Sequence, residues 1–182
     1  MRQPMKILLH TCCAPCLIFP LERLRGQGYE TEGFFYNPNI HPFNEYKNRK
    51  QAVLDYSQAS GLTVDYPEYD PAEFFRQINL KETSPGRCRL CWQLRLKKTA
   101  ATAKEKKFDL FSTTLLVSPY QDQSLIKEVG NVVSKEEGVE FYYEDFRPGF
   151  RKAHEQARAQ GVYCQKYCGC IYSEIDRCKP RK

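Results

Sequence analysis

The nine cysteines among the 182 residues are the side chains of this sequence best suited to chemistry. Six of them form close pairs: Cys12 with Cys13, Cys88 with Cys91, and Cys168 with Cys170. Thiols grouped in this way form disulfides, bind metals or take part in redox reactions. Random core packing would not place them next to one another.

The beginning of the sequence argues against disulfides. A secretory signal has an apolar segment of about 7–15 residues followed by a small-residue cleavage site. Here the apolar segment, residues 5–10, is shorter and runs directly into the first cysteine pair. No stretch approaches the roughly 20 apolar residues of a membrane-spanning helix. We therefore expect a cytoplasmic protein without a membrane partner, in which thiols serve metal or redox chemistry.

The three pairs offer six thiols, whereas a structural zinc ion is tetrahedral and binds about four ligands. Six thiols fit a four-iron cluster with spare ligands, or a cluster with a second metal. Two other interpretations stay open: a zinc site that fastens the C-terminal segment to the sheet, and a pair that cycles between dithiol and disulfide. Cys16, Cys164 and Cys178 stay open between a role in the site and ordinary core packing.

The elements that must hold these cysteines alternate between strand and helix. Residues 6–10 form a continuous apolar run, as in a strand buried on both faces. After Ser118, a candidate N-cap, Pro119 fits the first helical position and Gln121 fits a capping box. Further strands are predicted at residues 32–36, 62–66, 109–117 and 139–143, and further helices at residues 17–27, 43–60, 91–107 and 150–160.

This alternation predicts an α/β fold, a single three-layer Rossmann-like domain over residues 1–182 with a mostly parallel sheet. In such sheets the functional site lies beyond the carboxyl ends of the strands. There the first strand leads to Cys12 and Cys13, and later strands lead to residues 36–42 and 118–121. We therefore expect the metal cluster at this edge of the sheet.

The charge is suggestive without being decisive. The formal net charge is +6, and basic residues crowd residues 47–50, 87–107 and 147–152. A basic surface beside exposed aromatic side chains suits nucleic acid. The same excess also serves simply to keep helix faces soluble.

Six motifs together resemble one known family along nearly the whole chain. They are LLHTCCAPC at residues 8–16, FYNPNIHP at 35–42, RCRLC at 87–91, TTLLVSPYQ at 113–121, DFR at 145–147 and YCGC at 167–170. In these segments and in their order, the sequence resembles the epoxyqueuosine reductase family QueH.

The resemblance implies the last step of queuosine synthesis, in which epoxyqueuosine at the tRNA wobble position loses its epoxide oxygen. It also implies a [4Fe-4S] cluster with an adjacent iron, no cobalamin, and an electron donor that the sequence does not identify. The family is similar in fold to the adenine-nucleotide hydrolase-like, PP-loop group. That group has a glycine-rich loop where residues 12–16 here hold cysteines and no glycine, so ATP binding is not expected.

With the resemblance, roles can be predicted for individual residues. The expected metal ligands are Cys12, Cys13, Cys88, Cys91, Cys168 and Cys170, with Cys16 as a possible further thiol. Cys13 is expected to be essential for catalysis, and the candidate proton donors are Tyr120, Asp122, His10 and His41. The expected tRNA contacts are Tyr36, Asn37, His41, Tyr120, Arg147, Arg151 and Lys152, with Tyr36 exposed.

Some of these roles have structural alternatives. His10 would then be a hydrogen-bonded residue at a strand end, and Asp122 a carboxylate that complements a helix dipole. Two other functions also stay open: a zinc-stabilised tRNA-binding module without chemistry, and a thiol–disulfide oxidoreductase. The oligomeric state does not follow from the sequence.

Overall fold

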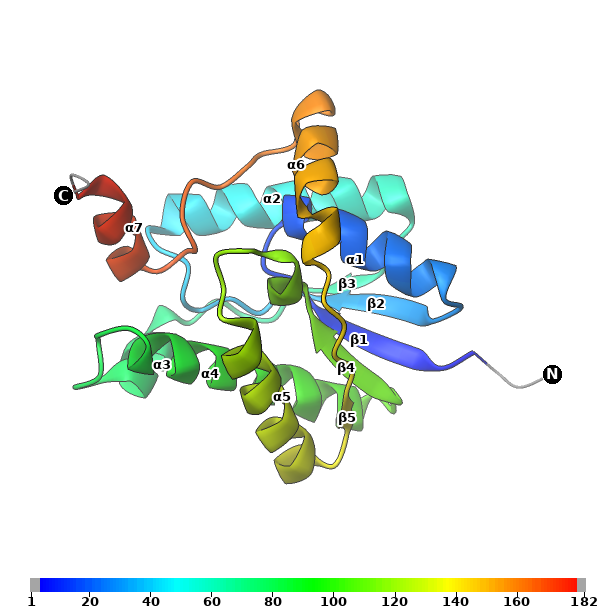
Figure 1. Cartoon of the computed structure of the whole chain (residues 1–182), viewed down its shortest axis with the longest axis horizontal. Coiled ribbons are helices and arrows are strands. Elements are labelled where there is room, and N and C mark those ends of the chain that lie inside the picture. Colours follow the sequence, from blue (N-terminus) through cyan, green and yellow to red (C-terminus); the bar gives the residue numbers. More distant parts are fainter. Residues whose placement is uncertain (1–3, 180–182) are drawn as a thin grey trace.

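The computed structural model describes residues 4–179 (Figure 1). Within these residues a parallel sheet of five strands has the order β3-β2-β1-β4-β5. The strands are β1 (Lys6–His10), β2 (Glu30–Phe34), β3 (Val64–Asp65), β4 (Leu110–Thr113) and β5 (Glu140–Phe141). β1 is central, and residues 7–9 have no solvent exposure, as the apolar run predicts.

Helices cover both faces of this sheet. They are α1 (Ala14–Gly26), α2 (Phe43–Ser60), α3 (Pro71–Ile78), α4 (Gly86–Glu105), α5 (Gln123–Glu137), α6 (Phe150–Ala159) and α7 (Ile171–Cys178). Figure 1 shows α1, α2 and α6 on one face and α4 and α5 on the other, with α7 on the side toward which β1 runs. The predicted three-layer, Rossmann-like α/β fold is therefore confirmed. Between residues 4 and 179, no helix has both the length and the apolar character needed to cross a bilayer.

Several boundaries differ from the prediction. α1 begins at Ala14 rather than residue 17, because Pro15 fits a first helical turn, where its missing N–H costs no hydrogen bond. α4 likewise begins at Gly86 rather than residue 91. β2 ends at Phe34 rather than residue 36, since its pairing with β1 stops there. The predicted strands at residues 62–66 and 139–143 keep only two paired residues each, at the two edges of the sheet.

The strand predicted for residues 109–117 ends at Thr113, and a 3-10 helix, η1 (Thr114–Val117), follows it. The Thr113 hydroxyl caps this turn by accepting a hydrogen bond from the Leu115 N–H at 3.1 Å. The helix predicted from Ser118 is α5, and it begins at Gln123 because the Asp122 carboxylate is the N-cap. α3 and α7 were not predicted, because helices of eight residues show little periodicity.

Candidate metal centre

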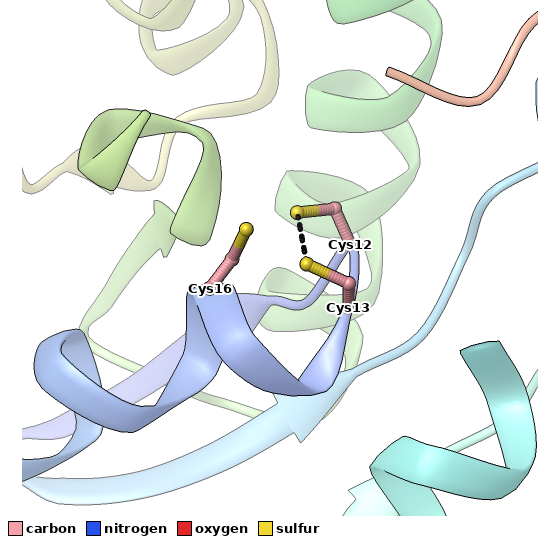
Figure 2. A group of neighbouring side chains, drawn as sticks. All are labelled: Cys12, Cys13 and Cys16. Atoms are coloured by element: carbon pink, nitrogen blue, oxygen red, sulfur yellow. Dashed lines mark hydrogen bonds between the residues drawn. The ribbon is translucent and has the colours of Figure 1, made fainter. Parts of the chain in front are cut away.

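Three cysteines meet where β1 leads into α1. Cys12, Cys13 and Cys16 are buried, and their sulfur atoms all lie within 4.8 Å of one another. Figure 2 shows the three side chains gathered at the beginning of α1, with Cys12 and Cys13 hydrogen-bonded at 3.7 Å. Among residues 4–179, no other set of three histidine, cysteine or acidic side chains is this close. We call these residues the thiol triad.

The thiol triad favours one thiolate. Hydrogen bonds with Cys13 and Cys16 hold the pKa of Cys12 well below its usual range, although burial opposes them. The Thr114 hydroxyl adds a hydrogen bond to the Cys12 sulfur at 3.2 Å. Burial raises the pKa of Cys13, and the hydrogen bond with Cys12 raises that of Cys16. One anionic sulfur with two protonated neighbours is a suitable starting state for a metal ligand set, since metals displace thiol protons.

Cys16 was predicted only as a possible further thiol, and the structure makes it a full member of the thiol triad. The spacing Cys13-x-x-Cys16 was the signal for it, because it repeats the spacing of Cys88 and Cys91. Gln165, which was not predicted, reaches the same place from the segment after α6. Its side-chain amide lies 2.8 Å from the Cys13 sulfur and 3.6 Å from that of Cys16.

A second group of thiols lies between α4 and α7. Its members are Cys88, Cys91, Cys168 and Cys170. Cys91 and Cys170 pack in one buried cluster with apolar residues of α3. Burial raises the pKa of Cys91 to about 12; the charge of Arg95 opposes this rise, and the other three thiols add to it. The other three thiols therefore lie within electrostatic range of Cys91, without any three of the four approaching as closely as the thiol triad.

Arg49 of α2 fixes the segment that carries the last cysteine pair. Its side chain is buried, with Nε 2.7 Å from Glu45. The two terminal nitrogens donate hydrogen bonds to the carbonyl oxygens of Tyr167 and Cys168, each at 2.9 Å. Gly169 separates the two cysteines at φ +142, and a Cβ there would lie only 3.0 Å from the Asn39 amide. Arg49 and Gly169 thus hold this segment against the loop that follows β2.

His10, a predicted proton donor, is fully buried beneath the site. Its Nε2 donates a hydrogen bond to the Tyr36 carbonyl oxygen at 3.1 Å, and its Nδ1 lies 2.9 Å from the Thr113 hydroxyl. Burial lowers the pKa of His10 to about 3, so the ring is neutral. With both nitrogens engaged, His10 has the geometry of the structural alternative, a hydrogen-bonded residue at a strand end.

The prediction that Tyr36 is exposed is wrong. Tyr36 is buried, and its hydroxyl donates a hydrogen bond to Glu73 of α3, a helix that the sequence did not reveal. Asn37 is buried as well; its amide donates to the Thr11 carbonyl oxygen at 2.9 Å and its oxygen accepts from Arg95 at 3.2 Å. Neither side chain is placed to stack on a base.

The remaining predicted residues lie nearer the surface. The ring of His41 stacks on Phe75 at 4.8 Å, and burial lowers the pKa of His41. Tyr120 is 84% exposed and touches Phe150 edge to face. Asp122 caps α5, which is the structural alternative for this residue.

The predicted phosphate contacts are exposed at the beginning of α6. Arg147 pairs with Asp145 and Arg151 with Glu155, at 2.5 and 3.0 Å, and Lys152 follows directly in the sequence. His154 was not predicted; its ring lies 4.2 Å from that of Phe150, and burial, helped by the charge of Arg158 and opposed by that of Cys12, lowers the pKa of His154.

Comparisons with known proteins find relatives along nearly the whole chain. The family model described as epoxyqueuosine reductase QueH matches residues 7–176. A protein of that name from Dehalococcoides mccartyi is 37% identical over 173 residues, which cover 94% of both chains. Another, from Thermotoga maritima, is 35% identical over 179 residues, or 94% of this chain and 91% of its own.

A solved structure with a related fold is a predicted subunit of a tRNA methyltransferase from Methanocaldococcus jannaschii. The TM-score is 0.56 with 11% sequence identity, over 85% of this chain and 74% of that one. At this level of identity, the likeness shows the fold alone.

Proposed function

The chain belongs to the epoxyqueuosine reductase QueH family, and from this premise we propose that it reduces epoxyqueuosine in tRNA to queuosine. The observation that carries the proposal is the thiol triad, three buried free thiols at the carboxyl edge of the sheet. This is the edge where sheets of this kind bind their ligands. We place the reaction in the cytoplasm.

The reaction needs two electrons and two protons. Both carbon–oxygen bonds of the epoxide break, a carbon–carbon double bond forms, and the oxygen leaves as water. The electrons come ultimately from an external electron donor, because each turnover leaves the protein's own centre oxidised by two electrons and that centre must be reduced again. The protein must therefore hold the modified base, keep a reducible centre beside it and supply protons.

The thiols fit an iron–sulfur centre, since soft thiolate ligands select iron–sulfur clusters and zinc. We propose that a [4Fe-4S] cluster and an additional iron are held by the thiol triad and by the second group, Cys88, Cys91, Cys168 and Cys170. When bound, they would supply one-electron transfer and a Lewis acid for the epoxide oxygen. Cobalamin and ATP have no part in this proposal.

The chain's own residues surround that centre. Gln165 orients the Cys13 and Cys16 sulfurs through its amide. Tyr120 is exposed and is our candidate for stacking on the unpaired wobble base, as aromatic side chains do in single-stranded RNA loops. His41 and Tyr120 remain our candidates for proton donation, because His10 has no free nitrogen and Asp122 is engaged as a cap.

The test is metal analysis of protein purified without oxygen, followed by turnover of tRNA that carries epoxyqueuosine. We expect iron, sulfide and a reducible EPR signal. Stoichiometric zinc without sulfide, even after attempted cluster reconstitution, would instead favour the tRNA-binding module. Thiol reactivity that survives metal removal, without epoxide reduction, would favour the thiol–disulfide oxidoreductase.

A single substitution separates catalysis from binding. Cys13→Ala removes a buried thiol of the thiol triad, so we expect epoxide reduction to be abolished while tRNA affinity stays nearly unchanged. Cys178→Ala, at an exposed thiol outside both groups, is the matched control and should turn over normally. A large loss of tRNA affinity with retained turnover in Cys13→Ala would contradict the assignment.

A further inference from the structure

Arg95 is a buried cation with an unused hydrogen-bonding edge. Its side chain, in the middle of α4, is 1% exposed. One terminal nitrogen donates to the Asn37 side chain at 3.2 Å. Nε and the other terminal nitrogen are buried and, among residues 4–179, have no partner. A guanidinium uses two such parallel N–H groups to bind an anion in bidentate fashion.

A buried charge without a counter-ion is strongly destabilising, so this edge calls for an anion. The other fully buried arginine shows the contrast: Arg49 uses Nε on Glu45 and both terminal nitrogens on backbone carbonyls. No carboxylate between residues 4 and 179 forms an ion pair with Arg95. Its edge is therefore left for a group that is not a side-chain carboxylate.

Anionic sulfur, as a cysteine thiolate or a bound sulfide, is the anion that the surroundings of Arg95 can supply. Cys91 lies one helical turn before it on α4, so the two side chains share a face of the helix. Cys91 is buried, and Cys168 belongs to the same thiol group. The positive charge of Arg95 acts on both thiols. The ring of His10, on which the charge of Arg95 also acts, is neutral and therefore cannot be the counter-ion.

We propose that the free edge of Arg95 holds anionic sulfur, thiolate or sulfide, of a metal centre built on Cys91 and Cys168. Arg95 is thus a positioning residue that also tunes this centre. Its charge and N–H groups stabilise the more negative, reduced form and raise the reduction potential. The redox part of this inference rests on the proposed function; the metal-binding part does not.

The test compares two substitutions with a matched control. Arg95→Lys keeps the charge and loses the two parallel donors, whereas Arg95→Met loses both. The control is Arg89→Met, which removes an exposed arginine of the same helix that pairs with Glu128. Zn²⁺ affinity of the metal-free protein is measured against a competing chelator, and Cys91→Ser identifies the zinc ion bound by this group.

We expect Arg95→Met to lower the affinity for that zinc ion by about tenfold or more, as is usual when a metal ligand loses its hydrogen-bonded support. Arg95→Lys should lower this affinity less. In the iron-loaded protein both variants should have a more negative midpoint potential, and Arg89→Met should match the unaltered protein. Wild-type zinc affinity and potential in Arg95→Lys would overturn the inference, even if Arg95→Met does not fold. If the unaltered protein never takes up a cluster, the proposed function fails, and the zinc measurement still decides the role of Arg95.

Discussion

At the scale of single residues, position distinguishes a grouped thiol at a helix N-terminus from an isolated one. Cys13 is the N-cap of α1 and Cys16 lies in the first turn, so both sulfurs sit at the positive end of a helix. Cys164 is half-buried, and within residues 4–179 its thiol donates a hydrogen bond only to the carbonyl oxygen of Val162, at 3.4 Å. The same side chain thus has different surroundings in the two places.

Cys16→Ser should therefore weaken metal binding at the thiol triad by about tenfold or more, because it replaces a soft sulfur donor with a weakly coordinating hydroxyl. The measurement is the metal content and Zn²⁺ affinity of purified protein. Cys164→Ser is the control and should leave both unchanged. Equal affinities in the two variants would remove Cys16 from the ligand set.

Residue types and strand order predicted where cysteines gather in the fold, but they predicted the burial of individual side chains poorly. The cysteine pairs and their edge of the sheet followed from spacing and strand order. The burial of Tyr36 did not, because it depends on Glu73 in α3, a helix too short to be read from its pattern. The buried cations Arg49 and Arg95 were also missed, since an arginine in a helix usually faces solvent.

At the scale of elements, one ion pair fastens the C-terminal segment to α2. Glu45 and Arg49 are one helical turn apart and buried, and Arg49 reaches the backbone of residues 167 and 168. A second hydrogen bond, from the Tyr163 hydroxyl to Glu45, ties the same segment from the other side. The second thiol group depends on this attachment, because two of its cysteines come from the segment.

Arg49→Lys should lower the free energy of unfolding by about 1.5–3 kcal/mol, the usual worth of hydrogen bonds to a charged group. It should also speed tryptic cleavage after Lys166, because the segment loses its two carbonyl contacts. Urea unfolding and timed proteolysis measure these effects. Lys47→Met, at an exposed position of the same helix, is expected to change neither. Wild-type protection of Lys166 in Arg49→Lys would show that the segment is held by other contacts.

Another attachment joins the end of α1 to the chain after β5, and it is sensitive to pH. Burial works to raise the pKa of Glu144, but hydrogen bonds from Tyr142, Arg23 and Gln27 lower it overall from 4.5. The folded state therefore binds fewer protons than the unfolded state near pH 4. By linkage, this contribution is present above the unfolded pKa and is lost as pH falls through the folded pKa.

Glu144→Gln should reduce stability by about 1 kcal/mol at pH 7, a modest value because Arg23 is half exposed. The variant should also lose less stability than the unaltered protein between pH 6 and pH 3. Urea unfolding at several pH values measures both. Glu155→Gln, whose partner Arg151 is almost fully exposed, is the control with no expected change in slope. A slope in Glu144→Gln as steep as that of the unaltered protein would assign the acid sensitivity to other groups.

At the scale of the whole molecule, the parallel sheet gathers positive potential at the edge that carries the thiols. Each helix that directly follows a strand begins at this edge, so the N-termini of α1 and α2 face it. The basic residues at the start of α6 follow β5 in the same way (Figure 1). Anionic sulfur and the phosphates of RNA are both favoured there.

Two substitutions at this edge should affect tRNA binding in different ways. Tyr120→Ala removes an exposed ring and should cost about 1–3 kcal/mol of binding free energy if the ring stacks on a base, with little change in salt dependence. Lys152→Ala removes a charge that, within residues 4–179, is not paired with a carboxylate. It should reduce the magnitude of the slope of the logarithm of the binding constant against the logarithm of the salt concentration by about 0.7. This is the value for one contact with a single-stranded phosphate.

Binding of tRNA at several salt concentrations separates the two effects, because stacking is nearly independent of salt whereas phosphate contacts release counterions. Lys135→Ala, in the last turn of α5 and thus at the far end of the strands, is the matched control for charge and should leave the slope unchanged. If Lys135→Ala and Lys152→Ala lower the slope equally, the tRNA responds only to the net charge of +6. If only Lys152→Ala does, the tRNA lies across the beginning of α6, where Tyr120 can reach its wobble base.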